Sequence, residues 1–170
     1  MERAADAIRR DRGCVVRVWI PGEPVGSTRP RFNLKTGRVY PNPKSAKWVE
    51  HCATLTRQKW GIRAPLDRPV VVHFTSVHGR PGRLVPRAMG GQLSKPRRAK
   101  LEEVFGDLSS RIPHIVKPDV DNVAKLVLDG LVKAGVVKDD TRVAELVGRK
   151  RYCALEEDAP GVEIEVMPWA

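Results

Sequence analysis

The chain has 170 residues, with 31 lysines and arginines against 20 aspartates and glutamates, which gives a formal net charge of +11 and a pI near 10.1. That length suits one domain with its own core, and that charge favours a polyanionic partner, because basic side chains neutralise phosphates and release counterions. No apolar run approaches the roughly 20 residues of a membrane span. No zinc motif or signal peptide is evident either, so we expect a cytoplasmic protein with reduced thiols, no membrane partner and no organic cofactor.

The first predicted elements are a strand and a long basic loop. We expect a poorly ordered lead-in at 1–13 and a single domain at 14–170. Residues 15–20 are rich in β-branched side chains and end at Pro-Gly, which predicts a strand. Proline and glycine in 21–43 predict a long loop, with a short hairpin turning at Thr36-Gly37. Its basic side chains suit DNA phosphates or, alternatively, only solvate the surface. Those we expect on DNA are Arg29 and Arg31.

A helix and a second strand follow. Helical periodicity runs over 46–60, after an Asn42-Pro43 pair that is typical of a helix start. Trp48 and Trp60 fall on or beside its apolar stripe, so we assign them to the core rather than to base stacking. Residues 69–77 are almost continuously apolar, which predicts a central strand covered on both faces.

Residues 78–113 form a basic insertion with glycines and prolines at its start. A long irregular segment inside a compact domain is usually functional or disordered. Ser94 predicts the start of a short helix that runs to about Phe105. We expect the insertion to order against DNA phosphates, the alternative being a charged, solvated excursion. The basic residues expected on DNA here and just beyond are Arg97, Arg98, Lys100 and Lys117.

The last third predicts a helix and two strands. The helix covers about 121–134 and stops at Gly135. Strands follow at 142–152 and 162–167, and the turn-like composition of 156–161 resembles a hairpin loop between them. We therefore expect an α+β fold, in which about two main helices pack on a small mixed sheet. The expected order is strand, helix, strand, basic insertion, helix, strand, strand.

The predicted helix at 121–134 has three faces. At about 100° per residue, Asp121, Lys125 and Asp129 share a polar stripe. Leu128 and Val132 form a second apolar strip, which would meet a partner subunit or, alternatively, a loop or the insertion. The core face is expected to consist of Val123, Leu126, Val127, Leu131 and Ala134.

Two acidic pairs flank this helix. Asp119 and Asp121 stand at its start, where one of them would alternatively serve as a cap, and Asp139 and Asp140 follow its end. Neighbouring carboxylates repel unless a cation lies between them, and hard oxygen ligands select Mg²⁺ or Mn²⁺. Phosphodiester hydrolysis needs an activated water and positive charge, which such a metal and Lys125 would supply. Lys125 alternatively serves as a helical i,i+4 ion-pair partner.

The motif KPDVDNVAKLVLDGL at 117–131, followed by KDDTRV at 138–143, resembles the RusA-type Holliday junction resolvases. RPRF at 29–32 and the segment leading to HIVKPD add to the resemblance, which covers the chain from about residue 15. It implies a homodimeric α+β endonuclease of bacterial or phage type, acting in DNA recombination and repair. It also implies resolution of four-way DNA junctions by paired symmetric nicks with Mg²⁺, for which we expect Mn²⁺ to substitute.

Carried over by motif, the resemblance assigns roles to the acids. Asp119, Asp121 and Asp140 would be catalytic acids and metal ligands, and Lys125 the catalytic lysine. Asp139 would assist them or fix the turn. Two alternatives stay open from the residues themselves: a non-catalytic basic DNA-binding module, and a metal-dependent nuclease for other branched DNA.

Overall fold

The computed structural model of the chain describes residues 15–28, 31–40, 42–85, 90–105, 112–154 and 159–169, with only the backbone at 31–33, 38–40 and 105. The predicted lead-in at 1–13 and Arg29 lie outside the described residues. The elements in chain order are β1 Val16–Pro21, β2 Arg31–Asn33, β3 Arg38–Tyr40, α2 Pro43–Trp60, β4 Val70–His78, the 3₁₀ turn η1 Gly82–Leu84, α3 Lys95–Phe105, α4 Val120–Ala134, the 3₁₀ turn η3 Asp140–Arg142, β5 Val143–Tyr152 and β6 Gly161–Pro168.

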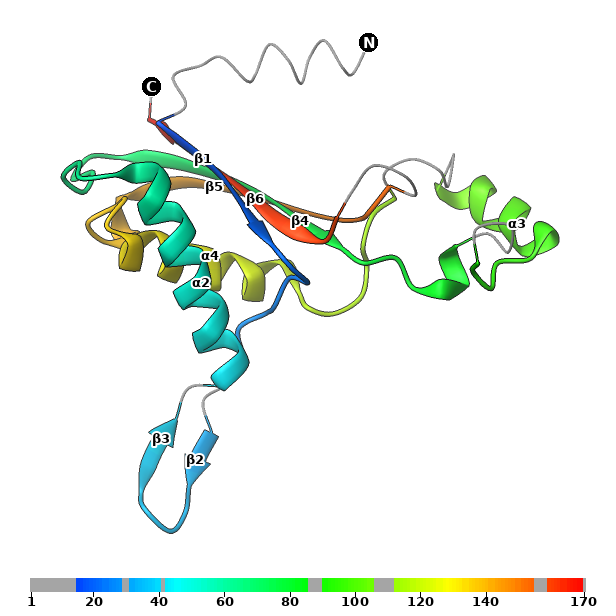
Figure 1. The fold of residues 1–170 in the computed structure, drawn as a ribbon, viewed down its shortest axis with the longest axis horizontal. Helices are drawn as coiled ribbons and strands as arrows, with labels where there is room; N and C mark the ends of the chain where they lie inside the picture. Colours follow the sequence, from blue (N-terminus) through cyan, green and yellow to red (C-terminus); the bar gives the residue numbers. More distant parts are fainter. Residues whose placement is uncertain are drawn as a thin grey trace.

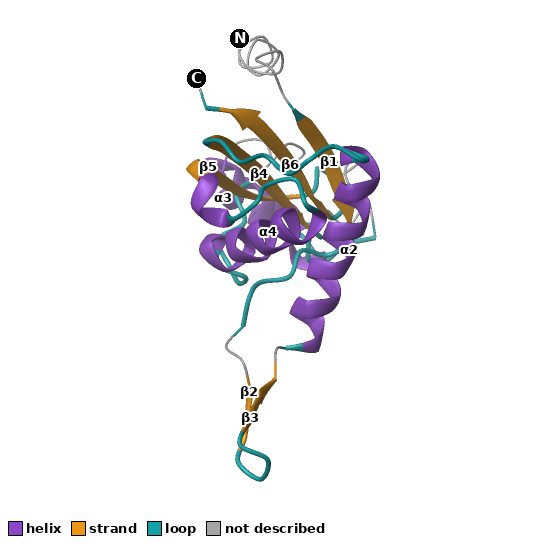
Figure 2. Cartoon of the chain, turned by 90° about the vertical axis from the view of Figure 1, so that its left-hand side faces the viewer, coloured by secondary structure: helices purple, strands orange, loops and turns teal. Residues whose placement is uncertain are grey.

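The body of the protein is a four-stranded mixed sheet, in the order β1-β6-β4-β5, with α2 and α4 packed on one face (Figures 1 and 2). This arrangement confirms the predicted α+β fold. β4 is central, as expected, but its alternation contradicts the expectation of cover on both faces. Val70, Val72 and Phe74 are buried under the helices, whereas Val71, His73 and Thr75 on the opposite face are half-buried. The second face of the sheet has no helix on it in the described part of the chain.

The expected hairpin between the last two strands is wrong. β4 lies between them: β6 pairs antiparallel with β1 and β4, while β5 pairs parallel with β4 on its other side. A parallel neighbour requires a crossover connection, and α4 lies in the connection from β4 to β5. The composition of 156–161, part of which lies outside the described residues, does not say which strand becomes the neighbour.

The predicted limits of α2 are confirmed by its caps. The Lys44 backbone N–H donates to Asn42 Oδ1 at 2.9 Å. Pro43 occupies the first helical turn, where a backbone N–H has no partner within the helix, so its missing N–H costs no hydrogen bond. The helix ends at Gly61, whose φ is +72°. Trp48 and Trp60 are buried in the core, as predicted.

α4 is the central helix of the core. All five residues of its predicted core face are buried, and it ends at Gly135, whose left-handed φ of +75° suits glycine. A methyl group added at Gly130 would lie 2.6 Å from Cys52 Sγ, so glycine allows α2 and α4 to approach closely. Leu128 and Val132 are half-buried and pack partly against this same core.

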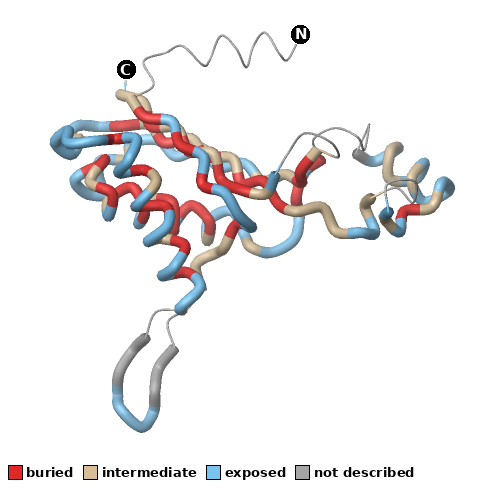
Figure 3. Tube along the Cα trace, in the orientation of Figure 1, coloured by how far each residue is buried: buried red, intermediate tan, exposed pale blue. Residues whose placement is uncertain are grey.

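Two segments project from the body (Figures 1 and 3). One is the β2–β3 hairpin, whose exposed turn at 34–37 confirms the predicted pivot. The other carries α3, which is confirmed close to its predicted limits. It has a small core of its own, in which Leu93, Ile112 and Tyr152 are buried. No helix in the described part of the chain is long and apolar enough to cross a membrane.

Candidate active site

The first acidic pair stands at the start of α4. Asp119 occupies the N-cap position with extended backbone, but its side chain makes no capping hydrogen bond. Both Asp119 and Asp121 are exposed. The Asp119 side chain therefore does not cap the helix, which was the alternative to metal binding. Lys125 and Asp129 are also exposed, which confirms the predicted polar stripe.

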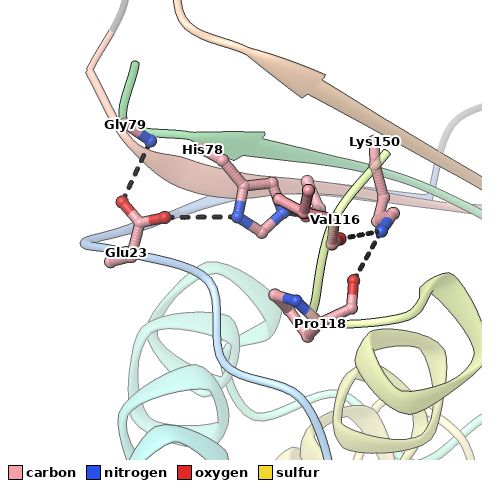
Figure 4. A network of polar contacts seen from close by, with 7 residues as sticks. Glu23, His78, Gly79, Val116, Pro118 and Lys150 are labelled. Carbon is pink, nitrogen blue, oxygen red and sulfur yellow. Dashed lines mark hydrogen bonds and ion pairs between the residues drawn. The ribbon is translucent and has the colours of Figure 1, made fainter. Parts of the chain in front are cut away.

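We call residues 115–119 the acid loop, because they lead from the sheet to this pair. Lys150 Nζ, from β5, donates to the carbonyl oxygens of Val116 and Pro118 at 2.8 and 2.5 Å (Figure 4). On the other side, a Cβ at Gly26 would lie 2.6 Å from Pro118 Cβ. The Ser27 N–H also donates to the Asn122 carbonyl at 2.8 Å. Contacts from two different elements thus hold the backbone that presents the aspartates.

The second acidic pair belongs to the turn before β5. Asp139 accepts a hydrogen bond from the Thr141 N–H at 3.0 Å. The pKa of Asp139 is lowered mainly by the Thr141 side chain and, after it, by this backbone hydrogen bond. Asp139 therefore fixes the turn, which was one of its two expected roles. Asp140 is exposed at the first position of η3.

Ion pairs and a backbone bridge hold that turn in place. Lys138 Nζ and Arg142 Nε both contact the Asp67 carboxylate, at 2.7 and 2.8 Å. Leu66 forms a parallel bridge with Val137. The second acidic pair is thereby fixed to the loop that follows α2, at the far end of α4 from the acid loop.

The two acidic pairs are far apart within one chain. α4 has 15 residues, so its ends are separated by about 22 Å at about 1.5 Å per residue. The length of β5 gives a similar separation. Lys150 lies beside the acid loop, Val143 lies close to Asp140, and the two residues are seven positions apart on the strand, at about 3.3 Å per residue. No group of three His, Cys, Asp or Glu side chains among the described residues is arranged to hold a metal ion. The expected three-acid cluster is thus not formed inside one chain.

The basic residues expected on DNA lie in different settings. Arg97 and Lys100 are exposed on α3, and Lys117 is exposed in the acid loop. Arg98 is half-buried and pairs with Glu102 at 2.7 Å, one turn further along α3. Arg31 lies on β2 without a described side chain, and Arg29 lies outside the described residues.

Sequence reasoning missed a buried polar cluster beneath the acid loop. It singled out neither His78 nor His114, which are both buried. The rings of His78 and His114 stack with their centroids 3.7 Å apart. They are 36 positions apart in the sequence, and no local pattern signals such a contact.

Comparison with known proteins identifies the family of the chain. The sequence profile of the family described as "Endodeoxyribonuclease RusA" matches residues 21–167. The class defined by this match is that of the DNA endonucleases, phosphodiester hydrolases of the kind that the charge and the acids predict. The chain belongs to the RusA family of endodeoxyribonucleases, which confirms the resemblance seen in the sequence. It is also 28% identical over 156 residues to "Uncharacterized protein YqaN" of Bacillus subtilis (strain 168), covering 89% of this chain and 94% of that protein.

Proposed function

We propose that this protein is a Mg²⁺-dependent endonuclease that resolves four-way DNA junctions by paired symmetric nicks, as a homodimer, in DNA recombination and repair. Membership of the RusA family is the observation that carries the proposal. The net charge of +11 supports a DNA substrate. A junction has approximate two-fold symmetry, so a two-fold dimer offers two equivalent sites to two equivalent strands.

The chemistry of the first acidic pair supports the metal. Asp119 and Asp121 are exposed carboxylates separated by one residue, and Asp119 is not engaged as a cap. Oxygen ligands of this kind suit Mg²⁺ or Mn²⁺. When bound, the metal would supply an activated water and positive charge at the phosphate. Lys125 would add positive charge one helical turn away, and the exposed Lys117 would contact a neighbouring phosphate.

The third acid fits this proposal only if two chains contribute to each site. Asp140 lies about 20 Å from the acid loop of its own chain, by the length of α4. A carboxylate at that distance neither shares a metal with Asp119 nor repels it appreciably, since charges are screened over about 8–10 Å. We therefore infer that Asp140 acts beside the aspartates of the partner chain.

The edge of the sheet offers a way to bring these groups together. β5 is an edge strand of the sheet. Among the described residues, Ile112 and His114 cover its last residues, through backbone hydrogen bonds with Tyr152 and Lys150. Antiparallel pairing of two such edges, over 143–149, places the start of one β5 beside the end of the other. Asp140 lies just before that start and the acid loop beside that end, so a two-fold axis at about Leu146 brings them together twice.

The side chains along this edge are compatible with a second copy. Leu146 of β5 and Val120 of α4 are each 41% exposed, so both offer apolar surface to a second copy. A Cβ at Gly148 would lie 2.9 Å from Val120, so the α4 row that continues to Leu128 and Val132 runs beside β5. In the two-fold arrangement Leu146 meets its own copy. The dimer contacts expected on α4, at Leu128 and Val132, and this strand edge then form one surface.

The first experiment is cleavage of one synthetic four-way junction, with nick positions mapped on all four strands. We expect paired symmetric nicks in Mg²⁺ or Mn²⁺ and none in EDTA. Asp121→Asn should lose nicking and retain junction binding. Binding without metal-dependent nicking by the unsubstituted protein would instead favour the non-catalytic module. Faster cleavage of flaps or nicked duplex would favour a nuclease for other branched DNA.

The second experiment tests whether the site spans two chains. Asp121→Asn and Asp140→Asn should each be inactive alone. After the two variants are mixed and allowed to exchange, a mixed dimer holds one site with both lesions and one intact site, so single nicks should reappear. A site built within one chain predicts no recovery, because each chain would carry a lesion.

A third experiment tests the surface itself. Leu146→Glu should shift the protein from dimer to monomer in light scattering, because it places a buried charge at the two-fold axis. Ile62→Glu is the matched control, since Ile62 is fully exposed in the loop that follows α2 and is not part of β5. A dimer that survives Leu146→Glu contradicts this interface.

A further inference from the structure

The two buried histidines beneath the acid loop have roles that the proposed chemistry does not use. His78, the last residue of β4, is 1% exposed, and His114 is 6% exposed. Their rings are nearly parallel, at 11°, and Tyr152 meets His114 edge-on at 4.7 Å. Side chains so deeply buried do not reach a DNA strand, so neither is a catalytic acid or base.

His78 is fixed through both ring nitrogens. Its Nε2 lies 2.5 Å from Ser76 Oγ, and its Nδ1 lies 3.2 Å from Glu23 Oε1. The arrangement fits a neutral ring whose Nδ1–H donates to the carboxylate while the Ser76 hydroxyl donates to Nε2. The other oxygen of Glu23 accepts from the Gly79 N–H at 3.0 Å (Figure 4). His78 is thus a rigid platform at the end of the central strand.

His114 rests on that platform and begins the path to the aspartates. Its backbone N–H donates to the Lys150 carbonyl at 3.2 Å, but its Nδ1 has no hydrogen-bond partner. What His114 contributes is therefore the flat face of its ring. Burial lowers the pKa of both histidines, that of His114 to about 4, so at neutral pH the two rings stack without like-charge repulsion.

The acid loop has little else of its own to fix it. Ile115 and Val116 are 75% and 46% exposed, and Lys117 and Asp119 are exposed as well. Its position is set by what holds its ends and its backbone: His114 before it, α4 after it, and Lys150 at two of its carbonyls. The segment that supplies Glu23 also supplies Gly26, which packs on Pro118, so the platform and the loop share a support.

We propose that His78 and His114 are positioning residues, which together with Lys150 hold the acid loop so that Asp119 and Asp121 are presented in one geometry. This inference rests on the proposed function, in which those aspartates are the catalytic acids. Groups that orient metal ligands affect metal affinity or activity by about 10–100-fold when they are removed.

The roles of the two rings predict an asymmetry. His114→Phe keeps a flat ring in the stack, and Nδ1 has no hydrogen-bond partner to lose, so this variant should behave like the unsubstituted protein. His78→Phe keeps a ring but removes the bonds to Glu23 and Ser76, and should loosen the loop. His114→Ala should loosen it as well, because the stack is gone. Thr75→Val is the matched control, since Thr75 lies on the opposite face of β4.

Two readouts separate positioning from general stability. The first is amide hydrogen exchange, which should become several-fold faster over 115–122 in His114→Ala and His78→Phe while β6 stays protected. The second is the Mg²⁺ concentration for half-maximal junction nicking, which should rise by about tenfold or more with junction affinity unchanged. His114→Phe and Thr75→Val should change neither.

If the variants of the two buried histidines fail to fold, a variant of Lys150 still tests the positioning role. Lys150→Met removes both donors to the acid loop and keeps the apolar stem, and should reproduce the effects of His114→Ala. Lys150→Arg should restore them in part. Unchanged exchange over 115–122 in both His114→Ala and Lys150→Met would overturn the inference. A protein that never nicks DNA would refute the proposed function instead, and the exchange data would still decide whether the loop is held in this way.

Discussion

Gly130 is a point of close approach between α4 and α2, and it allows a sharp test of the core. A Cβ at this position would lie 2.6 Å from Cys52 Sγ and 3.1 Å from Cys52 Cβ, whereas ordinary contacts between nonbonded heavy atoms are about 3.5–4.0 Å. Cys52 is fully buried, and its Sγ also lies 3.9 Å from Thr56 Oγ1, so the thiol is packed inside the core. Gly130→Ala should therefore overpack the helix crossing, at a typical cost of about 1–3 kcal/mol.

The higher helix propensity of alanine opposes this cost and makes the net destabilisation smaller. Alanine is better than glycine in a helix interior by about 1 kcal/mol, so the net destabilisation by Gly130→Ala should be about 0–2 kcal/mol. In a Cys52→Ala background the sulfur is absent, and the same substitution should become neutral or stabilising. The two positions should thus be coupled by about 1–3 kcal/mol in a double-mutant cycle.

The assay is urea denaturation of the four proteins, with Gly135→Ala as the control. Gly135 is the glycine that terminates α4. Unlike Gly130, it has nothing within 4 Å of its Cβ position, and its φ is +75°. Alanine there should cost about 1 kcal/mol from backbone strain, equally in both backgrounds. If Gly130→Ala costs the same with and without the Cys52 thiol, the thiol is not the obstacle and the packing argument fails.

Three further predictions concern titration, reactivity and DNA binding. Burial lowers the pKa of His114 from its ordinary 6.5 to about 4, so the unfolded chain takes up the proton first as the pH is lowered. The free energy of unfolding should therefore fall by up to about 3 kcal/mol as the pH is lowered from 6.5 to 4. His114→Phe should flatten that part of a pH series of urea melts. Burial raises the pKa of the Cys52 thiol to about 11, so iodoacetamide should label it far more slowly in the native state than in urea, and equal rates would contradict its burial. If Arg97 and Lys100 each neutralise a phosphate, the double alanine variant should reduce the slope of log affinity against log salt by up to about 2, and an unchanged slope would remove α3 from the DNA interface.

What the sequence predicted well was local. The Asn42 cap, the end of α2 at Gly61 and the core face of α4 follow from contacts within a few residues, where the 3.6-residue period decides which side chains share a face. The turn at 34–37 follows from local chemistry in the same way. Such features depend little on how the elements are later assembled.

What the sequence did not predict was set by contacts between distant parts of the chain. β4 and β5 pair through residues about 70 positions apart, and the turn-like composition before β6 gave no sign of the parallel neighbour. The stack of His78 on His114 is likewise non-local. The separation of the acids, by contrast, was available from the motif: 15 helical residues between Asp119 and the second pair already imply about 22 Å. A motif groups the acids by their order in the sequence, and it does not show whether one chain or two chains supply the acids of one site.

The pairing of β1 with β6 has a practical consequence for engineering. These are the first and last strands described, they run antiparallel, and Val16 lies opposite Val166. Residues 15 and 169 therefore emerge at the same end of the sheet (Figure 1), within reach of a linker of a few residues. Circular permutation should be tolerated, with the fresh termini opened in the exposed turn at 34–37.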